Sequence, residues 1–235
     1  MNSESRQKLY WQNEHQLNNP DIPSMASDKP SLVVQRFINF LREKNTPLSG
    51  SCVDIGSGKG RNAIYLAKQG LKVTCLDFID EALKEIERKA KAENLINQIE
   101  TRNSYISSPW EYPDNYFDFA IDCYASIDIE AKEGRATCIS EMYRCLKPGG
   151  YACLAVVAAD DEHESEVGNV NYTEEPNAVI WTNNNKFQKN YTLEELEKTY
   201  NKFIIFEISK IRKEVTKMGE QRESKDYFVF MQKPK

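Results

Sequence analysis

The sequence contains only two histidines, His15 and His163, and no pair of cysteines at the Cys-x-x-Cys spacing. Its six cysteines are scattered, at positions 52, 75, 123, 138, 145 and 153. Zinc sites and disulfide frameworks need clustered or regularly spaced ligands. We therefore predict reduced cysteines that pack as small apolar residues, and no metal site. The nearest candidate for a hard cation, Asp160, Asp161 and His163, is equally well explained as a solvated acidic loop.

Long apolar runs and an excess of positive charge are also missing. No run approaches the ~20 apolar residues that cross a bilayer, and residues 1–10 lack the apolar core of a signal peptide. The formal net charge is −5, whereas nucleic-acid-binding proteins usually have a clustered basic face. The one basic stretch, residues 210–225, is interrupted by glutamates and is better explained as a solvated hairpin loop. We expect a soluble, cytoplasmic protein, monomeric or homodimeric, that binds neither nucleic acid nor membrane.

Strand-like segments alternate with helix-like segments along most of the chain, which predicts a parallel sheet covered on both faces. Apolar runs predict five strands, at 51–55, 72–76, 98–102, 116–121 and 151–157. Helical spacing of apolar residues predicts one helix that begins at Pro30-Ser31 and three others, at 61–69, 79–94 and 129–146. The tail differs: a capping box of Thr192 and Glu195 predicts a helix over 192–200, and runs at 203–209 and 227–232 predict an edge hairpin.

We expect the 235 residues to form one domain. Residues 1–48 would form an N-terminal cap or gate, although residues 1–30 themselves are polar, with Tyr10 and Trp11 as isolated aromatics. Residues 49–157 would form the core, and residues 191–235 the C-terminal helix and hairpin. Residues 158–190 are first acidic and then rich in asparagine. Because long loops in compact domains are usually functional or disordered, we interpret them as an insertion beside the binding pocket.

The most informative segment runs from Val53 to Gly60, where glycines at 56, 58 and 60 join a strand to a helix. Glycines let the backbone turn sharply and approach a ligand closely. A dinucleotide fingerprint would need a glycine or alanine at position 61, which is arginine, and the spacing is not that of a P-loop. Asp54 precedes the first glycine by two residues. Its charge would repel a phosphate but suits a cationic ligand, such as one with an ammonium or sulfonium group.

About twenty residues further on, Asp77 ends the second predicted strand. A carboxylate there can accept hydrogen bonds from two ribose hydroxyls, and Phe78 beside it can lie against an adenine face. Dehydrogenases share this feature, so it does not discriminate between nucleotide binders by itself.

These segments resemble a known family when taken together with Tyr116–Ile121 and Leu146–Gly150. In order and spacing they resemble motif I, the post-I acid, motif IV and the following Pro-Gly-Gly turn of the class I S-adenosylmethionine-dependent methyltransferases, over roughly residues 50–157. The resemblance implies an α/β, Rossmann-like, doubly wound fold. Its mostly parallel seven-stranded sheet would have a reversed C-terminal β-hairpin and an N-terminal helical cap.

The resemblance also implies a function. The cofactor would be S-adenosylmethionine and its product S-adenosylhomocysteine, with direct in-line methyl transfer to a small-molecule acceptor. Two alternatives stay open: a protein of this fold that acts on a protein or RNA partner, and a non-catalytic cofactor-binding protein.

Carried over position by position, the resemblance predicts the cofactor site. The carboxyl end of the first strand would line the methionine and ribose part, with Asp54, Gly56, Ser57, Gly58 and, at the helix start, Arg61. The ends of the next strands would hold the nucleoside, with Asp77 at the ribose and Phe78, Asn103 and Ser104 at the adenine.

Two positions in this predicted site carry qualifications. Asn103 stands where the family often has an aspartate, a mild departure because its carbonyl oxygen can still accept a hydrogen bond. Asp122 and Cys123, after the fourth strand, match the position that faces the methionine moiety. A capping role for Asp122 is an equal alternative.

Within the family, the pattern is closest to small-molecule methyltransferases of the tellurite-resistance and thiopurine type, on Tyr10-Trp11, Gly60–Ala67 and Tyr191–Leu196. In that group the N-terminal segment closes over the cofactor. The predicted gate and substrate residues are therefore Tyr10, Trp11, His15 and Tyr124. No catalytic residue is assigned: a thiolate or soft anion needs no general base, whereas a hydroxyl or amine acceptor could be assisted by His15, Tyr124 or Asp160.

Overall fold

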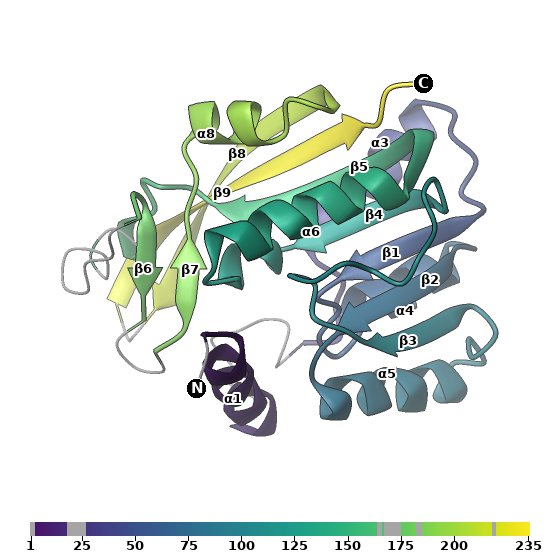
Figure 1. The fold of residues 1–235 in the computed structure, drawn as a ribbon, viewed down its shortest axis with the longest axis horizontal. Helices are drawn as coiled ribbons and strands as arrows, with labels where there is room; N and C mark the ends of the chain where they lie inside the picture. Colours follow the sequence, from purple (N-terminus) through teal and green to yellow (C-terminus); the bar gives the residue numbers. More distant parts are fainter. Residues whose placement is uncertain (1–2, 18–26, 164–165, 167–174, 182–184, 218–219) are drawn as a thin grey trace.

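The structure is a computed structural model, which describes residues 3–17, 27–163, 166, 175–181, 185–217 and 220–235. Its centre is a seven-stranded sheet in the order β3-β2-β1-β4-β5-β9-β8 (Figure 1). The first five strands pair in parallel, and β9 pairs antiparallel with both β5 and β8. The predicted doubly wound sheet with a reversed C-terminal hairpin is therefore confirmed. The strands are β1 (Ser51–Ile55), β2 (Lys72–Asp77), β3 (Ile99–Asn103), β4 (Phe117–Cys123), β5 (Leu146–Val157), β8 (Ile204–Lys217) and β9 (Glu220–Gln232).

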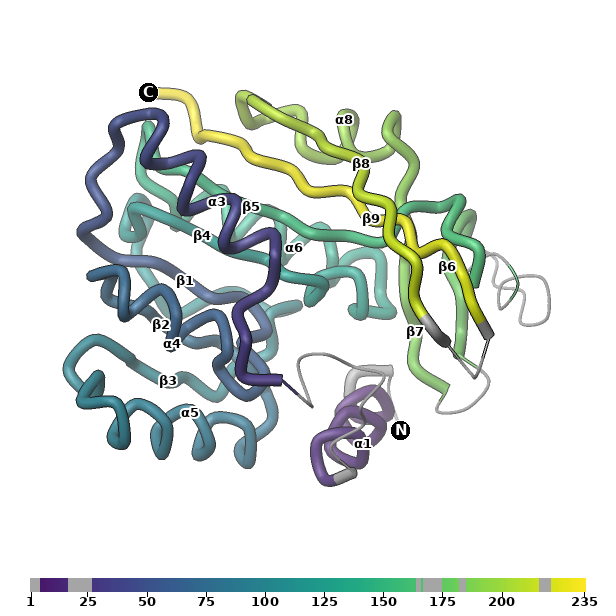
Figure 2. The backbone as a smooth tube through the Cα atoms, turned by 180° about the vertical axis from the view of Figure 1, so that it is seen from behind, coloured from purple at the N-terminus to yellow at the C-terminus, as the bar shows by residue number. Residues whose placement is uncertain are grey.

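Helices cover both faces of the sheet. On one face lie α3 (Leu32–Glu43), α4 (Arg61–Lys68) and α5 (Asp80–Ala92). On the other lie α6 (Lys132–Cys145) and α8 (Leu193–Thr199), and Figures 1 and 2 show the two layers from opposite sides. Side chains of β5 alternate between the two cores, because successive residues of a strand point to opposite faces. The capping box of Thr192 and Glu195 is present at the start of α8.

The strand order reverses between β1 and β4: β2 and β3 lie on one side, and β5 and the hairpin on the other. In an open parallel sheet, ligands bind outside the carboxyl ends of the strands at this point. The loops that follow β1 and β4 are therefore the elements around which the site is built. The second of these loops contains the short helix η1 (Ser126–Asp128).

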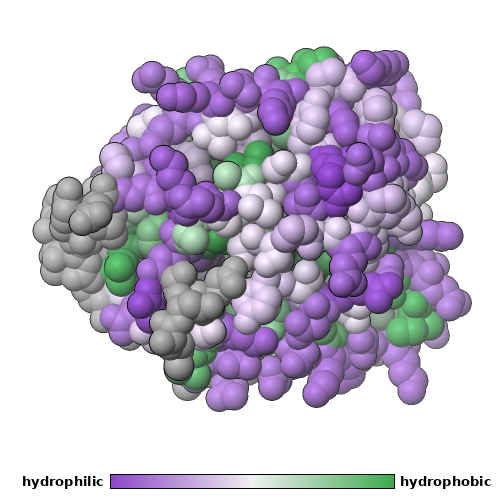
Figure 3. Space-filling model, viewed as in Figure 1, coloured by the Kyte–Doolittle hydropathy of each residue, from purple (hydrophilic) through white to green (hydrophobic). Residues whose placement is uncertain are grey.

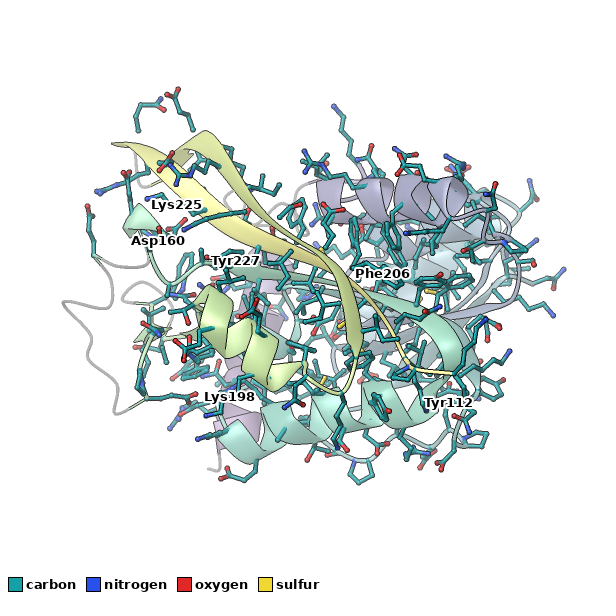
Figure 4. The ribbon with its side chains drawn as sticks, turned by 90° about the horizontal axis from the view of Figure 1, so that it is seen from above. Tyr112, Asp160, Lys198, Phe206, Lys225 and Tyr227 are labelled. Carbon is teal, nitrogen blue, oxygen red and sulfur yellow. The ribbon has the colours of Figure 1, made fainter. Side chains whose placement is uncertain are left out.

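The C-terminal hairpin is much longer than its apolar runs predict. Beyond Val157, which pairs with Asp226, β8 and β9 continue as a two-stranded ribbon that no longer pairs with β5. Lys225 extends its ammonium to the carbonyl oxygen of Asp160, at 3.0 Å, and Lys210 pairs with the Asp160 carboxylate, at 2.7 Å (Figure 4). Because most residues of this ribbon are polar, an apolar strand pattern in the sequence does not predict it. Acidic residues in the loop after β5 pair with its basic side chains.

Two elements at the carboxyl ends of the strands were not predicted from the sequence. One is α1 (Ser3–Leu17), which Figures 1 and 2 both place beside those ends. The other is a small sheet of β6 (Ala178–Ile180) and β7 (Phe187–Lys189), both within the predicted insertion. The N-terminal cap is thus helical, as the resemblance implies. Parts of the predicted gate and insertion, residues 1–2, 18–26, 164–165, 167–174 and 182–184, lie outside the described residues.

Two further findings bear on the predicted partners. Among the described residues, none of the helices combines the length and the apolar character that a membrane span requires. Within the same residues, no three side chains of His, Cys, Asp or Glu gather as a metal site would require. Asp161 instead accepts a hydrogen bond from the backbone amide of Lys225, at 2.7 Å.

Candidate active site

The three glycines of the loop after β1 all have positive φ angles, of 64° at Gly56, 52° at Gly58 and 77° at Gly60. Packing explains two of them. A Cβ on Gly56 would lie 2.3 Å from the Cβ of Ala125, and one on Gly60 would lie 2.6 Å from Cγ1 of Ile86. A Cβ on Gly58 would meet nothing within 4 Å. The middle glycine therefore borders open space, as a loop that admits a ligand requires.

Asp77 ties this loop to the end of β2. Its Oδ2 accepts a hydrogen bond from the amide of Gly58, at 2.8 Å, and its Oδ1 accepts one from the amide of Ile79, at 2.9 Å. Burial raises the pKa of Asp77 although both hydrogen bonds lower it. Each carboxylate oxygen can accept more than one hydrogen bond. Asp77 can therefore hold the loop and still bind a diol.

Asp54 lies on β1 beneath the loop and is only 2% exposed. Its Oδ2 has no hydrogen-bond partner. Burial and then the neighbouring Asp77 raise the pKa of Asp54 to about 8, although the charge of Arg61 at the start of α4 opposes this. The Ser57 hydroxyl is likewise buried and unpartnered. Such groups are costly without a partner, so a cationic ligand that also offers hydrogen bonds fits this place.

Asp122, at the end of β4, has a structural role. Its Oδ1 accepts hydrogen bonds from the amides of Ala125, at 3.0 Å, and Ser126, at 3.1 Å, and so caps the turn into η1. Asp122 therefore has the capping role in this structure, and its contact with the methionine moiety stays a prediction. The thiol of the next residue, Cys123, donates to the hydroxyl of Ser31 at the start of α3, at 3.2 Å.

Phe78, directly after Asp77, stacks on Tyr105, with ring centroids 5.4 Å apart and an angle of 2° between the ring planes. The ammonium of Lys8 on α1 lies 5.9 Å and 5.5 Å from these two centroids. Sequence reasoning missed Tyr105, although an aromatic residue shortly after the third strand was a usable signal. Asn103 is exposed and donates to the Asp80 carboxylate, at 2.5 Å. Its amide thus contacts α5 in this structure.

The predicted gate residues lie in two places. Tyr10, Trp11 and His15 are on α1, where His15 is buried and the other two are half-buried. Tyr124 follows β4 with a φ of 64°, which is strained for an aromatic residue. Burial and the nearby Asp226 carboxylate raise the pKa of Tyr124 well above its usual value.

Residues 52–150 match a family model described as a methyltransferase domain. Among curated proteins, the chain is similar to the S-adenosyl-L-methionine-dependent Diels-Alderase iccD of Talaromyces variabilis, with 28% identity over 130 residues. That match covers 55% of this chain and 44% of the relative, so it spans less than half of that protein.

Solved structures share the fold at low sequence identity. A S-adenosylmethionine-dependent methyltransferase from Methanosarcina mazei matches with a TM-score of 0.71 and 22% identity, over 83% of this chain and 97% of that one. The 1,6-didemethyltoxoflavin-N1-methyltransferase of Burkholderia thailandensis matches with a TM-score of 0.67 and 13% identity, over 100% of this chain and 92% of that one. Its structure contains bound 1,6-didemethyltoxoflavin and S-adenosylhomocysteine. Residues 52–150 are therefore similar to a methyltransferase domain, and the chain has the fold of S-adenosylmethionine-dependent methyltransferases of known structure. Its narrower resemblance to the tellurite-resistance and thiopurine type stays a prediction.

Proposed function

We propose that this chain is an enzyme that transfers the methyl group of S-adenosylmethionine to a small-molecule acceptor by direct in-line displacement. The observation that carries the proposal is the unpartnered Oδ2 of Asp54, buried beneath a glycine loop whose middle residue, Gly58, borders open space. A dinucleotide or a phosphate would not relieve this buried acid, whereas a cationic ligand would.

Different residues around the glycine loop would bind different parts of the cofactor. Asp54 and Ser57 would hold the charged methionine end, while Asp77 would hold the ribose and Phe78 the adenine. When bound, S-adenosylmethionine supplies a methyl group already activated by its positively charged sulfur. The protein then needs mainly to orient the acceptor and to exclude water. Helix α1 lies beside the carboxyl ends of the strands and would suit the second task (Figures 1 and 2).

The curated relative favours a second candidate function. Because that protein is described as a Diels-Alderase that depends on S-adenosylmethionine, a pocket of this kind can serve a reaction other than methylation. In that case the cofactor would bind here without being consumed. A protein or RNA acceptor is the remaining alternative, and the ion pairs of the basic ribbon with acidic residues do not favour RNA.

Calorimetric titration with S-adenosylmethionine and S-adenosylhomocysteine tests cofactor binding, which all of these candidate functions require. We expect both to bind, and an absence of binding would contradict every candidate. Transfer of labelled methyl groups to a panel of thiols, chalcogen oxyanions, phenols and amines then tests the activity. Release of S-adenosylhomocysteine together with a labelled product supports methyl transfer. Binding without turnover across the panel supports the second candidate.

A further inference from the structure

Helix α1 is fastened to both loops at the reversal of strand order. Lys59, in the loop after β1, donates from its ammonium to the backbone carbonyl of His15, at 3.2 Å. Gln7 donates to Glu130, in the segment after η1, at 3.1 Å. Gln7 also accepts a hydrogen bond from the amide of Phe187 on β7, at 3.4 Å. These contacts hold α1 beside the loop after β1 and the segment after η1, with β6 and β7 close to it (Figure 1).

An aromatic and cationic cluster lies at the junction between α1 and the small sheet. The ammonium of Lys186 lies 3.9 Å from the ring centroid of Trp11 and 5.9 Å from that of Trp181. The ring of His163 meets Trp181 edge-on, at 5.5 Å. Two of the three tryptophans of the chain thus meet here. In the space-filling view, patches of apolar residues appear on this side and elsewhere on a largely hydrophilic face (Figure 3).

His15, on α1, has a buried ring nitrogen near this junction. It is 8% exposed, and its Nδ1 is buried without a hydrogen-bond partner. Burial, Lys59 and Lys186 together lower the pKa of His15 to about 4, against the opposing charge of Glu14. The imidazole is therefore neutral near pH 7 and can accept a hydrogen bond at a ring nitrogen. Nothing in the described protein uses that capacity, which indicates a ligand with a matching donor.

We propose that the cluster of His15, Trp11 and Trp181 is the acceptor site, and that it takes a planar aromatic compound with a hydroxyl or ring N–H group. This inference rests on the proposed function. Lys186 lies over one face of Trp11, so the indoles would pack against the ring of the compound with the faces that Lys186 does not contact. The unpartnered nitrogen of His15 would accept the hydrogen bond from the donor group of the compound. Lys186 and Lys59 lie beside His15 with a positive charge that favours electron-rich oxygen or nitrogen on the ligand.

Calorimetry with matched probes tests this site in the full chain, saturated with S-adenosylhomocysteine. The probes are 2-naphthol and benzimidazole, each compared with its methylated analogue, 2-methoxynaphthalene or 1-methylbenzimidazole. We expect each donor probe to bind about tenfold more tightly than its methylated analogue, which is the effect of one net hydrogen bond. The two pairs also separate an oxygen donor from a nitrogen donor.

Variants assign the effect to residues. His15→Phe keeps a planar ring without nitrogen, so it should abolish the preference for the donor probes and leave the affinity for S-adenosylhomocysteine unchanged. Gln16→Ala, at the next and exposed position of α1, is the control and should behave as wild type. Trp181→Leu should weaken the binding of both members of each pair, and it serves as a second test if His15→Phe disturbs α1.

Three results would overturn the proposal: no probe binds although S-adenosylhomocysteine does, His15→Phe retains the donor preference, or Trp181→Leu binds every probe as wild type does. A failure of S-adenosylhomocysteine itself to bind would instead contradict the proposed function.

Discussion

Gly56 and Ala125 bring the loops after β1 and β4 into direct contact. A Cβ on Gly56 would lie only 2.3 Å from the Cβ of Ala125, a distance that real side chains do not reach. The positive φ of Tyr124, just before Ala125, turns the chain into this contact. The loops that follow the two strand ends at the reversal of strand order thus pack against each other through two small residues. The open space of the site begins two residues after Gly56, at Gly58.

Gly56→Ala should therefore destabilise the fold by about 2–3 kcal/mol, from the clash and from the positive φ of 64°. Chemical denaturation measures the loss. The second substitution Ala125→Gly removes the clashing methyl group, so it should restore part of the stability and leave the backbone strain of about 1 kcal/mol. A double variant no more stable than Gly56→Ala would show that the contact is not the cause.

Gly58→Ala should affect the binding of S-adenosylmethionine more than the stability of the fold. Because a Cβ at this position meets nothing within 4 Å, we expect a loss of stability of only about 1 kcal/mol, from the positive φ. The methyl group would occupy ligand space, so affinity for S-adenosylmethionine should fall at least tenfold in calorimetry. Unchanged affinity in the variant would show that the cofactor does not approach Gly58.

Asp77→Asn should weaken the binding of S-adenosylmethionine about 10- to 100-fold. The amide nitrogen of asparagine cannot accept a hydrogen bond, so either the Gly58 or the Ile79 amide loses its partner, and the ribose loses a charged acceptor. Titration calorimetry measures the change. The control is Asp114→Asn, on an exposed residue paired with Arg144, which should leave the affinity as it is.

Affinity for S-adenosylmethionine should rise with pH between about 5 and 8. The pKa of Asp54 stands near 8 in the protein alone, from burial, Asp77 and Asp122 against Arg61, and a cationic ligand favours the ionised form. Binding then releases a proton, and affinity gains up to tenfold per pH unit below the pKa. Calorimetry in buffers of different ionisation enthalpy detects that proton. Asp54→Asn should remove the part of the pH dependence of affinity that comes from the Asp54 carboxyl. An unchanged pH dependence would contradict the role of Asp54 in binding the cationic ligand.

Acid should loosen the packing of α1. The folded pKa of His15, about 4, lies below the unfolded value of 6.5, so the unfolded chain binds more protons between these values. The contribution of a neutral His15 is complete above pH 6.5 and is lost as the pH falls towards 4, and it amounts to about 3 kcal/mol. Lys59 and Lys186 oppose its protonation and Glu14 favours it. Hydrogen exchange of α1 amides across this range measures the effect, which His15→Phe should remove.

The sequence was enough for the core of the fold because its signals are local. Each buried parallel strand is a short apolar run, and each covering helix repeats its apolar residues at helical spacing. The glycine spacing and Asp54 act within eight residues, and the start of α8 is set by two residues of a capping box. These features predict the sheet, its order of elements and the position of the glycine loop without knowledge of any distant contact.

The extended ribbon and α1 were beyond such signals. The ribbon of β8 and β9 is polar and stabilised by pairing between its own strands and by ion pairs with the loop after β5. Helix α1 has no clear apolar stripe, and its contacts come from residues more than a hundred positions away, such as Glu130 and Phe187. Tertiary contacts therefore override a weak local preference in both elements.

The sequence by itself determined a nucleotide-type loop and the presence of an acid two residues before its first glycine, because residue identity and spacing are local properties. Only the tertiary structure decided which polar atoms have a partner. It buries Oδ2 of Asp54 and Nδ1 of His15 without a hydrogen bond, whereas Asp122 caps a turn and Asn103 donates to Asp80 on α5. Hydrogen-bond satisfaction and burial depend on contacts between distant segments, which a single sequence does not specify.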